Sequence, residues 1–151
     1  MENTLLSRPP GPSPLIRYNR LIFLLSIMGV IMAVYVFQSF IRQSPIVCVN
    51  TGCETVRKSQ YSYPFGIPVP FFGLVGYSLM AILAYIRTTS PEKLPLKAIL
   101  GIATFGVLFV SWFTYTELFI IKAVCTWCAV SAVNMLIIFS LALKSYQLSR
   151  K

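Results

Sequence analysis

The sequence predicts an all-α membrane protein, a bundle of four transmembrane helices. Its 151 residues are 56% hydrophobic and 11% charged, which leaves too little polar surface for a water-soluble domain of this size. Four apolar runs, at residues 21–41, 67–86, 98–121 and 124–143, each approach the roughly 20 residues with which a helix crosses hydrocarbon. The runs are continuously apolar, whereas strands of a membrane barrel would alternate and be about half as long. Helices are therefore expected.

The segment before the first run is expected to be a tail. Residues 1–20 contain four prolines between positions 9 and 14, and such a segment favours an extended, unpacked chain. The first run is too long for a removable signal peptide, and no small-residue cleavage pattern follows it. We expect a proline-rich tail at 1–20, a transmembrane domain at 21–145 and a basic C-terminus at 146–151.

The positive charges predict the orientation, because Lys and Arg near membrane helices remain preferentially on the cytoplasmic side. The two termini and the second connection hold nine of them, and the first and third connections hold four. The nine are Arg8, Arg17, Arg20, Arg87, Lys93, Lys97, Lys144, Arg150 and Lys151, and the four are Arg42, Arg57, Lys58 and Lys122. Both termini should therefore be cytoplasmic, in a multi-pass protein of the cell membrane.

The net charge of +9 could also indicate nucleic-acid binding. These charges are spread over short segments that flank the apolar runs, and no basic domain gathers them into one surface. We therefore expect membrane lipid, and no nucleic acid, as a partner.

All four cysteines fall on one side of the membrane in this topology. Cys48 and Cys53 lie in the first connection, and Cys125 and Cys128 lie at the start of the fourth run. The charge rule makes this side extracytoplasmic, which is where disulfides form and persist. The side was derived from the charges alone, so the position of the cysteines supports it independently.

The Cys-x-x-Cys pair has a specific chemistry at the start of a helix. The helix dipole and the unpaired amides of the first turn stabilise a thiolate and lower its pKa. Three positions along a helix return to nearly the same face, so Cys125 and Cys128 can open or close a disulfide with little backbone movement. The loop pair, CVNTGC, could carry electrons between an external partner and this helix.

Three other uses of the cysteines stay open at this point. Buried cysteines often act only as small apolar side chains, and structural disulfides could tie the loop to the helix. Two close pairs of cysteines are also a known zinc-ligand pattern, although extracytoplasmic thiols tend to oxidise, and we expect no metal. Two pairs on one side of the membrane favour a redox function over these three.

A family resemblance is carried by two segments, CVNTGCETVRKSQYSYPFGIPVPFFGLVGYSLM and YTELFIIKAVCTWCAVSAVNM. They resemble the vitamin K epoxide reductase family in its stand-alone prokaryotic form, over roughly residues 21–145. The most specific elements are the loop cysteine pair, Ser59 six residues after Cys53, the GIPVPFFG stretch, and the Cys-x-x-Cys pair of the last helix.

The resemblance implies a four-helix bundle that encloses a quinone, with a short helix in the loop between the first two transmembrane helices. Cys48 would be attacked by the thiolate of a thioredoxin-like (DsbA-like) partner, and Cys53 would exchange with Cys125. Cys128 would lie against the ring of a ubiquinone or a menaquinone/phylloquinone-type quinone. Ser59 would lie near the quinone and donate a hydrogen bond to a ring oxygen; the alternative is a helix-capping or solvated serine.

Two departures from the family refine the expectation. The sequence ends at Lys151 without a fused thioredoxin-like domain, so the redox partner should be a separate protein. Animal members have a tyrosine seven residues after the first cysteine of the Cys-x-x-Cys pair, where this sequence has Ala132. The difference favours disulfide generation with an ordinary quinone over epoxide reduction.

The predicted function is a quinone-dependent thiol oxidoreductase that re-oxidises the thioredoxin-like partner and supports disulfide bond formation. The alternatives are a quinone or quinone-epoxide reductase that uses external thiols, and a non-catalytic membrane protein stapled by disulfides. Glu117 lies near the outer end of the third run, where an ionisable group is costly unless it is paired or functional. It could assist proton transfer or be a solvated carboxylate at the interface.

Overall fold

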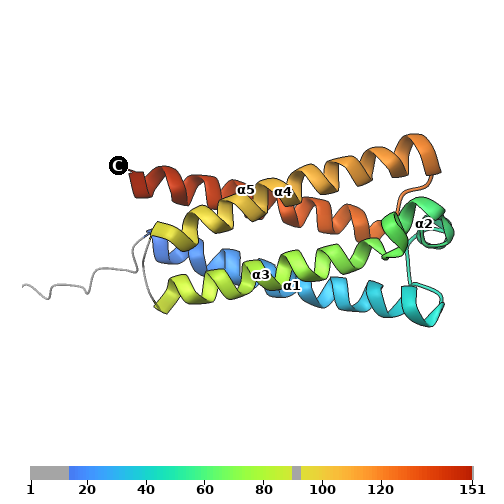
Figure 1. Cartoon of the computed structure of the whole chain (residues 1–151), viewed down its shortest axis with the longest axis horizontal. Coiled ribbons are helices and arrows are strands. Elements are labelled where there is room, and N and C mark those ends of the chain that lie inside the picture. Colours follow the sequence, from blue (N-terminus) through green and yellow to red (C-terminus); the bar gives the residue numbers. More distant parts are fainter. Residues whose placement is uncertain (1–13, 90–92, 151) are drawn as a thin grey trace, which may run out of the picture.

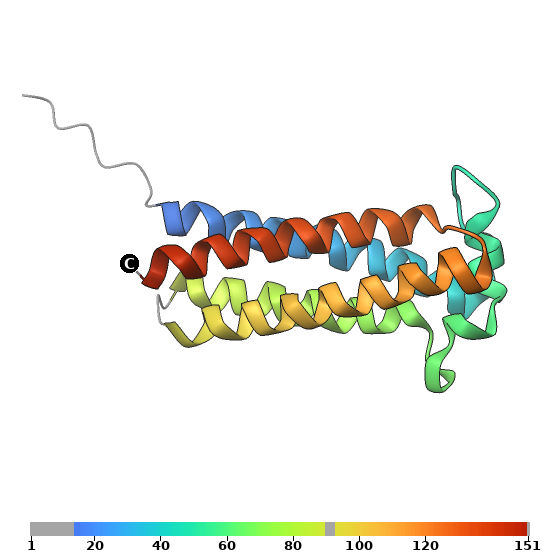
Figure 2. The same cartoon turned by 90° about the horizontal axis from the view of Figure 1, so that it is seen from above.

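The computed structural model describes residues 14–89 and 93–150, and within them it contains helices and connections but no strand. Four long helices, α1 (Pro14–Arg42), α3 (Val69–Thr89), α4 (Lys93–Tyr115) and α5 (Thr126–Arg150), run along a common axis (Figure 1). Helix α3 packs against α1 and α4, and α5 packs against α4 and α1, so the four form a closed bundle (Figure 2). The expected four-helix architecture is confirmed.

The spanning segments are Pro14–Arg42, Val69–Thr89, Pro95–Ile121 and Thr126–Arg150, each long and apolar enough to cross a membrane. The third combines most of α4 with η3 (Thr116–Ile121), a turn of π-helix. The chain is therefore a multi-pass membrane protein.

The short elements gather at one end of the bundle. Helix α2 (Gly52–Lys58) and the 3₁₀ turns η1 (Gln60–Ser62) and η2 (Pro64–Gly66) lie in the connection between α1 and α3. Figure 1 shows α2 at the end opposite the C-terminal end of α5. The short helix expected in the first connection is thus present, and the cysteine-bearing connections share one end of the molecule.

The four long helices bury some apolar side chains at the bundle centre and expose others on the outer faces. Ile22, Met80, Ile99 and Ile138 are buried in the bundle centre, whereas large apolar side chains on the outer faces are exposed, as expected where the solvent is lipid. The outward-facing group includes Leu24, Ile31, Phe105 and Leu108. Gly29 of α1 lies directly against the Tyr77 ring of α3, where a Cβ atom would overlap the ring.

Helix α1 begins earlier than the apolar run that predicted it. It starts at Pro14, within the expected tail, because packing continues beyond the apolar residues: Asn19 is buried and its Nδ2 donates to Ala84 O and to Thr88 Oγ1, both at 2.8 Å. Residues 14–20 are therefore helical. The rest of the expected tail, residues 1–13, lies outside the described residues.

Candidate redox site

The chain between α1 and α2 is fixed against the bundle by two aromatic side chains. The Val47 N–H donates to Tyr35 Oη at 3.2 Å, and Trp127 Nε1 donates to Val47 O at 2.8 Å. The two rings pack against each other with centroids 5.1 Å apart. Both backbone groups of Val47 are thus bonded, which fixes the position of the next residue, Cys48.

Helix α2 is held by a second set of polar contacts. Arg57, which is buried, donates to Glu54 Oε2 at 2.7 Å and to Gln43 Oε1 at 2.8 Å, while the Ile46 N–H donates to Glu54 Oε1 at 3.2 Å. The hydrogen bond from Arg57 holds the pKa of Glu54 below its usual value of 4.5, and the Ile46 amide adds to this effect against partial burial. These contacts join α2 to the end of α1.

Gly52 allows α2 to approach the segment before α5 directly. A Cβ atom at this position would overlap the carbonyl oxygen of Val124. Only glycine therefore permits this distance between the two backbones. The residue after each partner is a cysteine, so the contact also sets the distance between Cys53 and Cys125.

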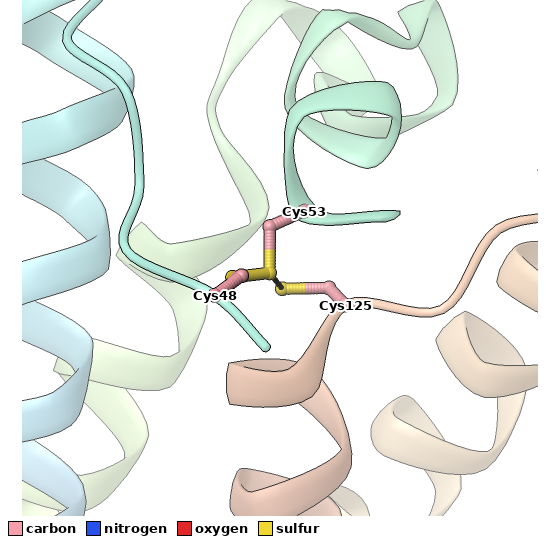
Figure 3. A group of neighbouring side chains, drawn as sticks. All are labelled: Cys48, Cys53 and Cys125. Atoms are coloured by element: carbon pink, nitrogen blue, oxygen red, sulfur yellow. Dashed lines mark hydrogen bonds between the residues drawn. A yellow bond between two sulfur atoms is a disulfide. The ribbon is translucent and has the colours of Figure 1, made fainter. Parts of the chain in front are cut away.

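Three of the four sulfur atoms form one group (Figure 3). Cys48 and Cys53 are joined by a disulfide, and the Cys125 thiol donates to Cys53 Sγ at 3.3 Å. Cys53 is 1% exposed and Cys125 is 2% exposed, whereas Cys48 is half-buried. A free thiol thus lies in contact with a disulfide, which is the arrangement that thiol–disulfide exchange requires.

Cys125 immediately precedes α5 and acts as its N-cap residue, since its carbonyl accepts the first helical hydrogen bond from the Ala129 N–H at 3.0 Å. Cys125 and Cys128 are both free thiols. A hydrogen bond from Cys128 lowers the pKa of Cys125 below its usual value of 9.0, although burial and the negative charge of Glu117 oppose this effect. Cys125 is therefore suited to carry the thiolate.

Glu117 is directed into this site by the end of the third spanning segment. The π-helical turn η3 ends at Lys122, which has left-handed backbone angles (φ 56°, ψ 33°), and Glu117 O accepts from the Lys122 and Ala123 amides. Glu117 is 2% exposed. One of its carboxylate oxygens and the sulfur atoms of Cys125 and Cys128 all lie within 4.8 Å of one another.

A cavity of about 530 Å³ extends from Cys128 into the bundle. The residues that line it are mostly apolar and come from all four long helices. Tyr77, Thr114 and Ser131 add polar groups to this lining. The other lining residues are Met32, Ala33, Val36, Val69, Pro70, Phe71, Phe72, Gly73, Val75, Gly76, Leu79, Gly101, Ile102, Phe105, Gly106, Phe109, Val110, Phe113, Trp127 and Met135. An apolar cavity with a few polar groups fits a quinone ring and the start of its tail.

Metal binding is a second chemistry to weigh at this site. Cys125, Cys128 and Glu117 are ligand types that zinc accepts, and their ligand atoms lie close together. The loop pair is a disulfide, so Cys48 and Cys53 do not offer thiolates in this state. The expectation of no metal stays a prediction.

Ser59 lies at the start of η1. It is half-buried, its Oγ accepts from the Tyr61 N–H at 3.3 Å at the start of η1, and it is not among the cavity-lining residues. The structure thus gives Ser59 the capping contact that was the stated alternative. Its contact with a quinone remains a prediction.

Two residues of the site were missed by sequence reasoning. The sequence pattern assigns no role to Trp127 or to Tyr35, which lies inside the first apolar run. The structure joins the two residues at Val47. The position of Trp127 between the two cysteines was the available signal. Tyr35 offered none.

Comparison with known proteins agrees with this geometry. No curated protein matches the chain. A model described as the vitamin K epoxide reductase family matches residues 20–143, which include all four cysteines and most of the chain. This match indicates a membrane oxidoreductase that acts on thiols and disulfides, and members of this family in general use quinones. The chain belongs to the vitamin K epoxide reductase family.

Proposed function

We propose that the protein re-oxidises a separate thioredoxin-like (DsbA-like) protein and passes the electrons through its two cysteine pairs to a quinone. The observation that carries this proposal is the contact of 3.3 Å between the Cys125 thiol and Cys53 Sγ of the loop disulfide. A stapled structural protein would gain nothing from a free thiol held against a disulfide. A relay needs this contact at every turnover.

The first exchange takes place at Cys48. The partner's thiolate attacks Cys48 Sγ, the Cys48–Cys53 bond breaks, and Cys53 leaves as a thiolate. The partner's second thiolate then resolves the mixed disulfide, so that the partner leaves oxidised and both loop cysteines are reduced. Cys48 is the more exposed loop sulfur, which favours it as the point of attack.

The second exchange joins the two pairs. The Cys53 thiolate attacks Cys125 Sγ of an oxidised Cys125–Cys128 disulfide, and Cys128 leaves as a thiolate. Cys48 then attacks Cys53, which releases Cys125 and restores the loop disulfide. The product has a loop disulfide and two free thiols, the state that the structure presents.

Cys128, at the cavity wall, is the proposed exit for the electrons. A quinone bound in the cavity would accept two electrons and two protons for each disulfide formed. The apolar lining excludes water around Cys128, and Trp127, Tyr77 and Ser131 are the residues positioned to contact a ring. The proposed quinone is of the ubiquinone or the menaquinone/phylloquinone type, and the assay described below compares the two types.

The proposed orientation has both termini cytoplasmic and the cysteines extracytoplasmic. The uneven distribution of Lys and Arg supports it. At the end of the bundle that carries the cysteines, the positive charge of Arg57 is also neutralised, because Arg57 forms an ion pair of 2.7 Å with Glu54. The test is cysteine labelling with a membrane-impermeant maleimide, in intact and in permeabilised cells. Labelling only after permeabilisation would contradict this orientation.

The direct test is quinone reduction by purified protein in detergent, followed by absorbance. Reduced thioredoxin-like protein or dithiothreitol supplies the electrons, and wild type is compared with Cys48→Ala and Cys128→Ala. We expect both variants to lose turnover with the protein donor, and Cys48→Ala to retain turnover with dithiothreitol. No quinone-dependent turnover by the wild type with any donor would overturn the proposal in favour of a stapled bundle.

A further inference from the structure

The relay leaves one buried ionisable group without a role. Among residues 14–89 and 93–150, both ion pairs are made by Glu54, so Glu117 has no cationic partner there. Its Oε1 atom is buried and accepts no hydrogen bond. An unpaired carboxyl group at membrane depth is costly, and such groups are retained mainly where they act.

The surroundings of Glu117 point to the reduced thiols. A carboxylate oxygen of Glu117 lies within 4.8 Å of both Cys125 Sγ and Cys128 Sγ. Proton transfer would require Glu117 to rotate its side chain until an oxygen lies within hydrogen-bond distance of a thiol. The π-helical turn η3 and the left-handed Lys122 direct the side chain inward, and such turns are frequent at functional sites.

The chemistry of the Cys-x-x-Cys pair creates the need for such a group. When Cys125 and Cys128 form a disulfide, they release two electrons and two protons. The electrons pass to the quinone of the proposed function. The Cys128 proton can pass with them, because Cys128 faces the cavity, whereas the proton of the buried Cys125 needs a carrier.

We propose that Glu117 is the catalytic base of this step, taking the proton from the Cys125 thiol as the Cys125–Cys128 disulfide forms. The Cys125 thiolate then attacks Cys128 Sγ. As the S–S bond forms, the S–H bond of Cys128 breaks, and its electron pair and proton pass to the quinone of the proposed function. Glu117 gives its own proton to the same quinone, which completes the hydroquinone, and is again a carboxylate. When Cys53 and Cys48 later reduce the pair, the two protons lost by those thiols are taken up by Cys125 and Cys128.

This inference rests on the proposed function, and its test uses variants of Glu117 in the full chain. Glu117→Gln keeps the shape of the side chain but cannot accept a proton, and Glu117→Asp retains the carboxyl group. Thr116→Val is the matched control, because it removes a buried hydroxyl from the same turn. The bond that this hydroxyl makes, 3.0 Å to Trp112 O, lies within the same spanning segment. Thermal melting in detergent establishes that each variant is folded.

The first measurement is the rate at which protein pre-reduced with dithiothreitol reduces a water-soluble quinone in a single turnover. Removal of a general base typically lowers a rate by about 10²–10⁴-fold. We expect a decrease of at least about 100-fold in Glu117→Gln, an unchanged quinone affinity, and partial recovery in Glu117→Asp. Equal rates in Glu117→Gln and Thr116→Val would overturn the inference.

The second measurement needs no quinone and no turnover. Infrared difference spectra of wild type, dithiothreitol-reduced minus oxidised, report whether a carboxylate loses a thiol hydrogen-bond donor when the two thiols become a disulfide. We expect a carboxylate difference band that disappears in Glu117→Gln and remains in Thr116→Val. A spectrum without such a band would overturn the inference, even if the quinone assay succeeded. A spectrum with the band, together with no quinone turnover, would contradict the proposed function alone.

Discussion

The Sγ atom of Cys125 lies 3.3 Å from the Sγ atom of Cys53, although 72 positions separate the two residues in the sequence. Cys53 is bonded to Cys48 in this state (Figure 3), so Cys53 has neighbours on both sides with which it can form a disulfide. A change of bond from Cys48 to Cys125 needs a displacement shorter than one side chain. The two pairs can therefore exchange without unfolding α2.

This contact predicts which cysteines can be trapped together. In the double variant Cys48→Ser/Cys128→Ser, the remaining Cys53 and Cys125 should form a disulfide readily on mild oxidation, because their sulfur atoms already touch. Mass spectrometry of proteolytic peptides would detect the crosslink. The double variant Cys53→Ser/Cys125→Ser, which retains Cys48 and Cys128, is the control and should crosslink more slowly, because these two sulfur atoms do not belong to one group in the structure. Equal rates would show that the loop moves too freely for the contact to matter.

Gly52 is expected to be sensitive to the smallest substitution. Gly52→Ala places a methyl group against Val124 O, which forces two backbone segments apart and should lower the free energy of unfolding by about 1–3 kcal/mol. Turnover with the protein donor should fall further than stability alone explains, since Cys53 moves with α2. Thr55→Ala, on the exposed side of the same helix, controls for changes in α2. A Gly52→Ala protein with wild-type melting and turnover would contradict the importance of this contact.

Trp127→Phe removes one hydrogen bond and keeps an aromatic ring against Tyr35. Loss of the Nε1 donor to Val47 O should cost about 0.5–1.5 kcal/mol. Amide hydrogen exchange over residues 44–49 should therefore become about twofold to tenfold faster. Trp112→Phe, at an exposed tryptophan of α4, should leave that exchange unchanged. If both variants behaved alike, Trp127 would be an interfacial aromatic residue and no more.

Glu54 predicts how stability changes at low pH. Its folded-state pKa lies below the usual value of 4.5, chiefly because of the hydrogen bond from Arg57. Its contribution to stability is therefore complete above about pH 4.5 and is lost as the pH falls through the lower folded-state pKa. Because the Glu54 side chain is 33% exposed and solvent screens the pair, the contribution is about 1 kcal/mol. Melting temperatures between pH 7 and pH 3 should fall more in wild type than in Glu54→Gln, and parallel curves would contradict the prediction.

The cavity predicts a separation between quinone binding and thiol exchange. Gly76 lines the cavity, and a Cβ atom there meets open space, so the larger side chain of Gly76→Phe would occupy part of the volume. We expect KM for the quinone to rise by at least about tenfold, equivalent to about 1.4 kcal/mol of binding, while exchange between the cysteine pairs continues. Ile82→Phe, on the exposed face of the same helix, is the control. An unchanged KM in Gly76→Phe would place the quinone elsewhere.

The apolar runs and the cysteine spacing predicted much of this architecture. The thickness of the membrane sets the length of an apolar run, and its hydrocarbon interior requires the apolar composition. The four spanning helices therefore followed from the sequence directly. The start of α1 did not, because the polar contacts of Asn19 with α3 continue the packing beyond the apolar residues. The inward direction of Glu117 also could not be predicted, since it depends on a π-helical turn and on left-handed backbone angles at Lys122.

Helix faces were the hardest feature to predict. In water, polar residues mark the outer face of a helix, but here lipid-facing residues such as Leu24 and Ile31 are as apolar as those of the core. Tyr35 therefore gave no sign that it meets Trp127 at Val47. The contact of Ser59 with Tyr61 was equally hidden, because a capping serine and a ligand-binding serine look the same in sequence.

The burial of Cys53 and Cys125 behind the half-buried Cys48 affects which thiols can react with the protein. Small thiols in the surrounding fluid can reach one sulfur of the loop disulfide readily, but they reach the other sulfur and the thiol beneath it only when present in excess, as dithiothreitol is in the assay above. Val47 and Val49, on either side of Cys48, are 77% and 92% exposed, so an apolar protein surface would contact more of this site than a hydrophilic small molecule would. Under the proposed relay, burial thus makes a membrane oxidant selective for protein substrates and limits the loss of quinone to the cell's soluble reductants.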